Sequence, residues 1–270
     1  MAEREGGVRP RRPRRTVLQT LECGVLSSEP PTGQNPVIGE PIRHGYTGVE
    51  KRLGLAARFV DWQDAAVLDV GCGNGAYTLE IAKRAARTVG IDLEAAHLAE
   101  FAERAAGAAD VSMARAAGER LPFADQRFDV VFCIETLEHV SDERETLGEI
   151  RRVLRPKGHV VLAVPNKWYL FETHGLRGMK GSHRLPFASW LPQRIHRRIA
   201  NARIYTAGEI TRLVRDAGFQ ALRLDWMLPP LDKVGSRALR SGLRGLLRAA
   251  EPTPLRRFGV SIIVVARKPA

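Results

Sequence analysis

The sequence of 270 residues predicts an α/β fold built on a doubly wound, mostly parallel sheet. Short runs of consecutive apolar residues alternate along the chain with segments of helical periodicity. Strands without polar alternation are typical of parallel sheets that helices cover on both faces. A glycine-rich turn follows the first apolar run, and such turns commonly open a ligand site in α/β domains.

The predicted elements follow one another in regular order. Apolar residues at helical spacing predict a first helix over 48–59. Strands are expected over 66–70, 88–93, 111–116, 128–134, 159–164, 221–227 and 260–267. Helices are expected over 76–87, 95–106, 142–154, 206–218 and 236–248. The fourth of these opens with a capping box, Thr206 with Glu209, and closes at Gly218.

The net charge of +12 is unevenly distributed along the chain. Residues 65–165 hold 12 basic and 16 acidic residues, whereas 167–204 hold 8 and 1, and 232–257 hold 7 and 2. The first 16 residues contain six arginines. Such segments can attract an anionic partner or can be solvated arginine-rich faces. We expect a disordered basic arm over 1–16, an N-terminal cap segment and helix over 17–61, and an α/β domain over 62–270 with a lid insertion at 165–204.

Cysteine usage and hydropathy indicate a reduced, non-spanning protein. The three cysteines, Cys23, Cys72 and Cys133, have no metal-type spacing, and no run of 18 apolar residues occurs. No apolar segment follows the basic N-terminus, so we expect no secretory signal. We therefore expect a cytoplasmic protein, with contact at the inner face of the membrane as a further possibility.

The strongest motif is the segment Val67-Leu-Asp-Val-Gly-Cys-Gly-Asn-Gly75. Its glycines let the backbone turn sharply and approach a ligand closely. The spacing differs from the dinucleotide motif, and Asp69 precedes the turn inside a buried strand, where a carboxylate needs a partner. Asp92 ends the next strand, 17 residues after Gly75, and can accept hydrogen bonds from both hydroxyls of a ribose.

These residues resemble the class I S-adenosylmethionine-dependent methyltransferases, specifically the type 11 branch, from about Gly48 to Phe219. Further matches are the segments 118–123, 128–131, 154–158 and 203–219. The resemblance implies a Rossmann-like, seven-stranded sheet with an antiparallel last strand and S-adenosyl-L-methionine as cofactor. It also implies the cofactor-binding residues Asp69, Gly71, Cys72, Gly73, Gly75, Asp92, Leu93, Gly118, Glu119 and Ile134.

Within that set, Asp69 and the glycine turn are expected to hold the methionine part and Asp92 the ribose. Leu93 would pack on adenine, and the Gly118–Glu119 loop would meet the adenine edge. The family usually has an acidic residue shortly before this glutamate, but Ala117 stands here. Adenine recognition would then rest on backbone groups or on Glu119.

The segment Glu135-Thr-Leu-Glu-His139 follows a strand that ends at the expected cleft. His139 is the first candidate for a general base, and His174 and His183 are alternatives. His139 can instead cap the following helix or orient a loop. We expect no metal, although the spacing of Glu135, Glu138 and His139 also resembles the metal-binding segments of ubiquinone-biosynthesis O-methyltransferases and small-RNA 2′-O-methyltransferases.

The lid insertion is the expected acceptor side. Its aromatic residues can stack on a ring, and its basic residues can hold phosphate or carboxylate: Trp168, Tyr169, Phe171, Trp190, His174, His183, Arg177, Lys180 and Arg184. The lid weakly resembles those of bacterial methyltransferases that modify glycans, and the basic helix over 236–248 suggests an anionic membrane surface. The leading hypothesis is O-methylation of a sugar-containing or other small hydroxylated acceptor.

Two alternatives stay open. One is an RNA 2′-O-methyltransferase, although without an RNA-binding module a nucleic acid is not the expected partner. The other is a non-catalytic scaffold that binds the cofactor. The sequence does not identify the acceptor or the oligomeric state.

Overall fold

The computed structural model describes residues 47–108, 110–182, 185–231 and 236–270. The predicted arm at 1–16, most of the cap segment at 17–61, Cys23, His183 and Arg184 lie outside the described residues.

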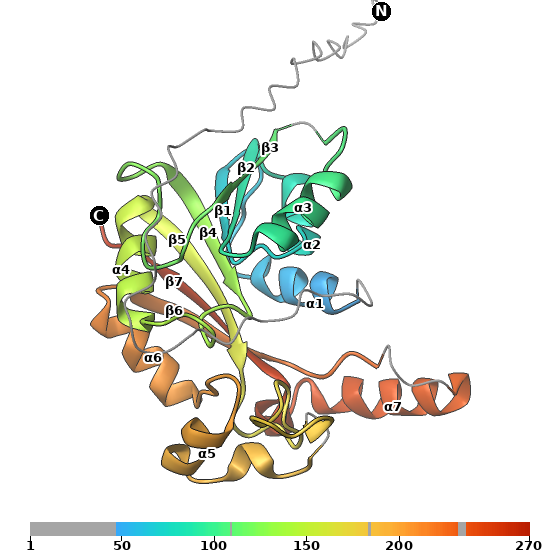
Figure 1. Ribbon diagram of the computed structural model, residues 1–270. Helices are drawn as coiled ribbons and strands as arrows, with labels where there is room; N and C mark the ends of the chain where they lie inside the picture. Colours follow the sequence, from blue (N-terminus) through green and yellow to red (C-terminus); the bar gives the residue numbers. More distant parts are fainter. Residues whose placement is uncertain (1–46, 109, 183–184, 232–235) are drawn as a thin grey trace, which may run out of the picture.

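A seven-stranded sheet forms the centre of the molecule (Figure 1). Its strands have the order β3-β2-β1-β4-β5-β7-β6. The strands are β1 (Ala66–Val70), β2 (Arg87–Asp92), β3 (Val111–Arg115), β4 (Phe128–Ile134), β5 (Leu154–Pro165), β6 (Gln220–Met227) and β7 (Ser261–Arg267). The first five strands in this order, β3, β2, β1, β4 and β5, pair in parallel, whereas β7 runs antiparallel to both of its neighbours, β5 and β6. The predicted mostly parallel sheet with an antiparallel last strand is confirmed.

Helices cover both faces of this sheet. On one side lie α1 (Thr47–Ala56), α2 (Ala76–Ala82) and α3 (Ala95–Arg104); on the other lie α4 (Glu143–Val153) and α6 (Ala207–Asp216). The capping box of Thr206 and Glu209 at the start of α6 is present as predicted. The side chain of Asp142 caps α4 by accepting hydrogen bonds from the backbone of Arg144 and Glu145. His139 therefore does not cap that helix.

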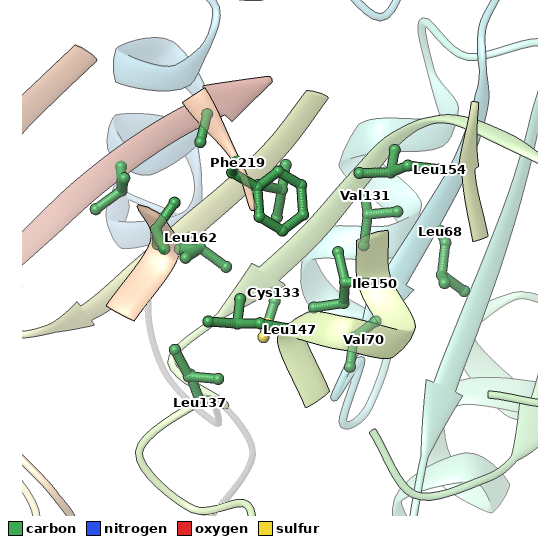
Figure 2. Close-up of a cluster of buried hydrophobic side chains, with 14 of the residues drawn as sticks. Leu68, Val70, Val131, Cys133, Leu137, Leu147, Ile150, Leu154, Leu162 and Phe219 are labelled. Carbon is green, nitrogen blue, oxygen red and sulfur yellow. The ribbon is translucent and has the colours of Figure 1, made fainter. Parts of the chain in front are cut away.

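Each central strand supplies both cores because successive side chains point to opposite faces. In β1, Leu68 packs with the α4 side and Val67 with the α1 and α2 side. Figure 2 shows part of the first core, in which Leu147 and Ile150 of α4 lie against residues of β1 and β4. Each fully buried side chain of this size contributes about 1.5–3 kcal/mol. Burial on both faces explains the continuous apolar runs in the sequence.

Two element boundaries differ from the sequence prediction by five residues. Helix α2 ends at Ala82 instead of residue 87, because the backbone N–H groups of Ala86 and Arg87 donate hydrogen bonds to the carbonyl of Ala65 and β2 begins at Arg87. Strand β5 begins at Leu154 instead of residue 159, because Leu154 already pairs with Phe128. In both places, pairing with a neighbouring strand overrides local propensity.

The segment between β5 and α6 contains the short helices η2 (Ala188–Trp190) and α5 (Gln193–Ile199) beyond the carboxyl ends of the parallel strands. At the same end lie α7 (Arg237–Ala250), where a helix was predicted, and η3 (Pro254–Phe258). Within the described ranges, none of the helices combines the length and the apolar character needed to span a lipid bilayer.

Candidate functional site

The glycine turn after β1 packs tightly against neighbouring elements. The backbone N–H groups of Gly71 and Cys72 both donate to the carbonyl of Ile91, each at 2.8 Å. Gly71 and Gly75 have φ values of +73° and +77°, which side chains rarely tolerate. A Cβ atom at Gly71 would collide with Thr136, and one at Gly75 would collide with Phe101. The turn therefore requires glycine at both positions for conformation and for space.

Asp92 at the end of β2 binds the same turn. Its Oδ2 accepts a 2.8 Å hydrogen bond from the backbone N–H of Gly73, and its Oδ1 accepts one of 2.9 Å from Glu94. Nδ1 of His97 lies 3.1 Å from Oδ1. A carboxylate offers about four lone-pair sites, so room for a hydroxyl donor stays on this group. The structure thus brings together the predicted turn and Asp92, the residue predicted to bind the ribose.

Asp69 is 2% exposed and lies in β1 below the turn. Its Oδ2 accepts a 2.6 Å hydrogen bond from the hydroxyl of Thr78 in α2. Burial raises the pKa of this carboxyl to about 7, against the lowering effect of the Thr78 hydrogen bond. A cation bound beside Asp69 would compensate the buried charge. This is the chemistry expected of the ammonium group of a methionine moiety.

The residues expected on the adenine side are more dispersed. Leu93 directly follows Asp92 and is 36% exposed, so its side chain is available to a ligand. Glu119, however, accepts a 2.6 Å hydrogen bond from the backbone N–H of Ser141 near the start of α4. Gly118 lies against Val70 and Thr146. Contact between adenine and the Glu119 carboxylate stays a prediction.

Two further predicted residues line the core side of the turn. Ile134 ends β4 and is 5% exposed. Burial raises the pKa of the Cys72 thiol far above its usual range, and the same holds for Cys133 in β4. Cys72 and Cys133 are therefore uncharged, buried thiols, as the sequence predicts.

Glu138, His139 and His174 form a compact cluster after β4. One ligand atom from each of the three side chains lies within 4.8 Å of the other two. The rings of His139 and His174 meet edge to face, with centroids 5.0 Å apart. The Glu138 side chain is 0% exposed, and neither of its oxygens accepts a hydrogen bond from the described residues. Its Oε1 lies 3.6 Å from Nε2 of His174.

The environment of the cluster favours the uncharged forms of Glu138 and His174. Burial, with a further contribution from Glu135, raises the pKa of the Glu138 carboxyl well above its usual range. Burial lowers the pKa of His174, so its imidazole is neutral at neutral pH. A neutral imidazole can take a proton from the hydroxyl group of a bound methyl acceptor.

Thr136 connects this cluster with the cofactor turn. Its side chain fills the space that a Cβ atom of Gly71 would take, and its hydroxyl lies 3.4 Å from the carbonyl oxygen of Gly71. Glu138 and His139 follow within three residues. The cluster is therefore adjacent to the turn.

Glu135 has a different role from the one its spacing suggested. Its Oε1 lies 3.0 Å from Nη2 of Arg52 and accepts a 2.7 Å hydrogen bond from the hydroxyl of Ser261. Arg52 also donates to the hydroxyl of Tyr77 at 3.1 Å. Burial acts to raise the pKa of Glu135, but the charge of Arg52 and the other partners lower it. Sequence reasoning missed this network because α1, α2, β7 and the residue that follows β4 supply one member each.

A second buried pair holds His174 in place. Oε2 of Glu172 lies 2.7 Å from Nε2 of His196, and both side chains are at most 1% exposed. Oε1 of Glu172 accepts a 3.1 Å hydrogen bond from the backbone N–H of His174. The lid segment thus has its own polar core, which supports one member of the cluster.

The cluster also has the donor set that a divalent cation would need. A buried carboxylate without a hydrogen bond and two imidazoles suit ions such as Mg²⁺, Mn²⁺ or Zn²⁺. The set differs from the spacing-based one because His174 joins Glu138 and His139, while Glu135 is paired with Arg52.

Comparisons with known proteins relate this chain to methyltransferases. Residues 68–162 match the family model described as a methyltransferase domain. The ubiquinone biosynthesis O-methyltransferase of Alkalilimnicola ehrlichii is 37% identical over 128 residues, covering 43% of this chain and 51% of that protein. The homologue from Pseudomonas paraeruginosa, of the same name, is 35% identical over 140 residues, covering 50% and 56%. The chain thus spans about half the length of the curated relatives it matches.

Solved structures share the fold at low identity. An S-adenosylmethionine-dependent methyltransferase from Mesorhizobium loti superposes with a TM-score of 0.59 at 19% identity, covering 83% of this chain and all of that one. At this identity the likeness concerns the fold alone. The family match spans β1 to β5, which contains the glycine turn, Asp92 and Glu138. Residues 68–162 are therefore similar to the methyltransferase domain family, and the chain has the fold of solved S-adenosylmethionine-dependent methyltransferases.

Proposed function

We propose that this enzyme transfers the methyl group of S-adenosylmethionine to a hydroxyl group of a small acceptor, either sugar-containing or otherwise hydroxylated. The observation that carries the proposal is the cluster of Glu138, His139 and His174 beside the cofactor turn. The two imidazoles supply the proton-accepting groups that a hydroxyl acceptor needs, and the buried carboxyl group of Glu138 lies beside them.

The chemistry sets the requirements of the site. Methyl transfer from a sulfonium is an in-line displacement, and alignment alone can supply about 7–11 kcal/mol of the barrier. A hydroxyl oxygen must in addition lose its proton to become an effective nucleophile. The neutral imidazole of His174 can take this proton, and His139, whose ring meets that of His174 edge to face, is the second candidate. A divalent ion bound at the cluster would lower the pKa of the acceptor hydroxyl.

The relatives support transfer to oxygen, since they are named O-methyltransferases of ubiquinone biosynthesis. Their acceptor does not carry over, because the chain covers about half of their length. The segment between β5 and α6 also lies beyond the family match, which ends at residue 162. This chain's own lid would therefore select the acceptor.

The test is transfer of a labelled methyl group from S-adenosylmethionine to glycans, lipid extracts, phenols and RNA, followed by mass mapping of the product. We expect a methyl ether on a small acceptor. His139→Asn and His174→Asn should each lower turnover by about 100-fold or more, with cofactor affinity unchanged. His159→Asn is the matched control, because His159 lies in β5 opposite Val130, toward the amino end of β4, whereas the cluster begins beyond the carboxyl end of β4.

Other outcomes would contradict the proposal. Label on RNA, with affinity that falls steeply as salt rises, would favour an RNA methyltransferase. Cofactor binding without transfer to any acceptor would favour a scaffold. Repeating the assay with a chelator shows whether a divalent ion or an imidazole alone activates the acceptor hydroxyl. Loss of turnover that Mg²⁺ or Mn²⁺ restores indicates an ion at the cluster, and unchanged turnover indicates the imidazoles alone.

A further inference from the structure

Four exposed aromatic side chains gather on one face of the molecule, beyond the carboxyl ends of the parallel strands. They are Trp168, Phe187, Trp190 and Phe258, with exposed fractions of 44%, 54%, 39% and 49%. The Trp190 ring lies 6.3 Å from that of Trp168, 5.0 Å from Phe187 and 6.4 Å from Phe258, measured between centroids. We call this set the aromatic surface. Contiguous exposed rings on a soluble fold indicate a binding surface.

Buried polar side chains hold the aromatic surface in shape. Lys167, 8% exposed, donates through Nζ to the carbonyls of Ser189 and Leu191, on either side of Trp190. Asn166, 3% exposed, donates through Nδ2 to the carbonyls of Arg257 and Gly259, on either side of Phe258. Two adjacent residues after β5 thus fix both segments that present the rings. The exposure of the rings is a built feature of the fold.

Positive charge surrounds this surface. Helix α5 carries Arg194, Arg197 and Arg198, all exposed, together with Ile195 at 49% exposed. Residues 236–258, which form α7 and η3, contain six arginines and one acidic residue, Glu251. Two exposed leucines, Leu246 and Leu255, project from the same two elements. Figure 1 shows α5 and α7 at the same end of the molecule.

We propose that the aromatic surface docks this protein on an anionic lipid bilayer. Tryptophan and phenylalanine insert at the level of the lipid headgroups, while surrounding arginines are attracted to anionic lipids. The rings meet mostly edge to face, at interplanar angles of 73° and 79° around Trp190, so they do not form the separate stacking platforms that single-stranded RNA requires. This proposal does not depend on the identity of the acceptor.

The test uses the full chain and vesicles of phosphatidylcholine, with or without about one quarter phosphatidylglycerol. We expect sedimentation with the anionic vesicles only, and weaker binding as salt increases. The double variant Trp190→Ala, Phe258→Ala should lower the partition coefficient at least tenfold, and so should the triple variant Arg194→Gln, Arg197→Gln, Arg198→Gln. The matched control is Arg212→Gln, Arg215→Gln, which removes exposed charge from α6.

Fluorescence gives a second measurement on the unaltered protein. Of the four tryptophans, Trp62 is 2% exposed and Trp226 is partly buried against the core, so quenching by brominated lipid should come mainly from Trp168 and Trp190, and the variant Trp190→Phe should lower it. Three results would overturn the proposal: no binding to anionic vesicles at low salt, equal binding by wild type and both surface variants, or a dimer in sedimentation velocity that Trp190→Ala, Phe258→Ala dissociates. The last result would assign the surface to a second copy of the chain.

Discussion

The hydroxyl of Thr78 in α2 donates a 2.6 Å hydrogen bond to Oδ2 of Asp69 in β1. This is the polar contact that the structure gives to a carboxyl group buried at 2% exposure. Burial raises its pKa to about 7, although the hydrogen bond works in the opposite direction. The charge of this group, which is predicted to hold the methionine part of the cofactor, therefore changes near neutral pH.

The affinity for S-adenosylmethionine should depend on pH through Asp69. Below its pKa of about 7 the carboxyl is neutral and attracts no cation; above it the charge is present. Affinity should therefore rise by up to about tenfold per pH unit as pH increases toward 7, and then level off. Calorimetry between pH 5.5 and 8.5 measures this. Asp69→Asn should flatten the profile, and Thr78→Val should move it to higher pH. A wild-type profile identical to that of Asp69→Asn would contradict the assignment.

Removing the charge of Asp92 should weaken cofactor binding. Asp92→Asn keeps the shape of the side chain but offers one oxygen where the turn and Glu94 now use two. With the expected ribose contact also weakened, affinity should fall by about 10- to 100-fold. The control is Asp216→Asn, an exposed carboxylate on α6 that pairs with Arg144. Equal affinity of the Asp92→Asn variant and the wild type in calorimetry would remove Asp92 from the site.

Local patterns made the cofactor side predictable. The turn from Gly71 to Gly75 and Asp92 occupy the ends of adjacent parallel strands, and strands of this type place their carboxyl ends at one edge. The continuous apolar runs predicted the strands of the sheet correctly, because both faces of the central strands are buried. The main errors are element boundaries, such as the end of α2, where pairing between strands decides.

The acceptor side was less predictable because its contacts join distant segments. His174 lies 35 residues after His139 in an irregular lid, so no periodicity places the two rings together. The same holds for Glu135, whose partners Arg52 and Ser261 lie 83 and 126 residues away in the sequence. The spacing in the sequence suggested that Glu135 and Glu138 act together, whereas in the fold Glu135 pairs with Arg52.

Breaking the pair of Arg52 and Glu135 should destabilise the fold more than removing both charges. Their side chains are 11% and 23% exposed, so Glu135→Gln leaves a nearly buried guanidinium without its counter-ion. The free energy of unfolding should fall by about 3–5 kcal/mol, and by less in the double variant Arg52→Met, Glu135→Leu. Urea denaturation at pH 7 measures both.

The control for that experiment is Lys83→Gln, which removes an exposed pair with Glu80 and should change the free energy of unfolding by no more than about 1 kcal/mol. If the double variant lost as much stability as the single one, the interaction would be a packing effect of the side chains and not an ion pair.

Glu172 should act as a positioning residue for His174. One of its oxygens pairs with the buried His196, and the other accepts the backbone N–H of His174, which fixes the start of the loop that carries the imidazole. Glu172→Gln keeps the size of the side chain but weakens both contacts, because a neutral amide replaces the charge. We expect the rate of methyl transfer to fall about tenfold while the dissociation constant of the cofactor stays the same.

The control for Glu172→Gln is another variant of the lid, Gln193→Leu. It loses a 2.8 Å hydrogen bond to the carbonyl of Ile204 and controls for general loosening of the lid. Equal rate losses in the two variants, at equal losses of thermal stability, would reduce Glu172 to a structural role; a larger loss in Glu172→Gln, with cofactor affinity unchanged, would place its effect on the acceptor side through His174.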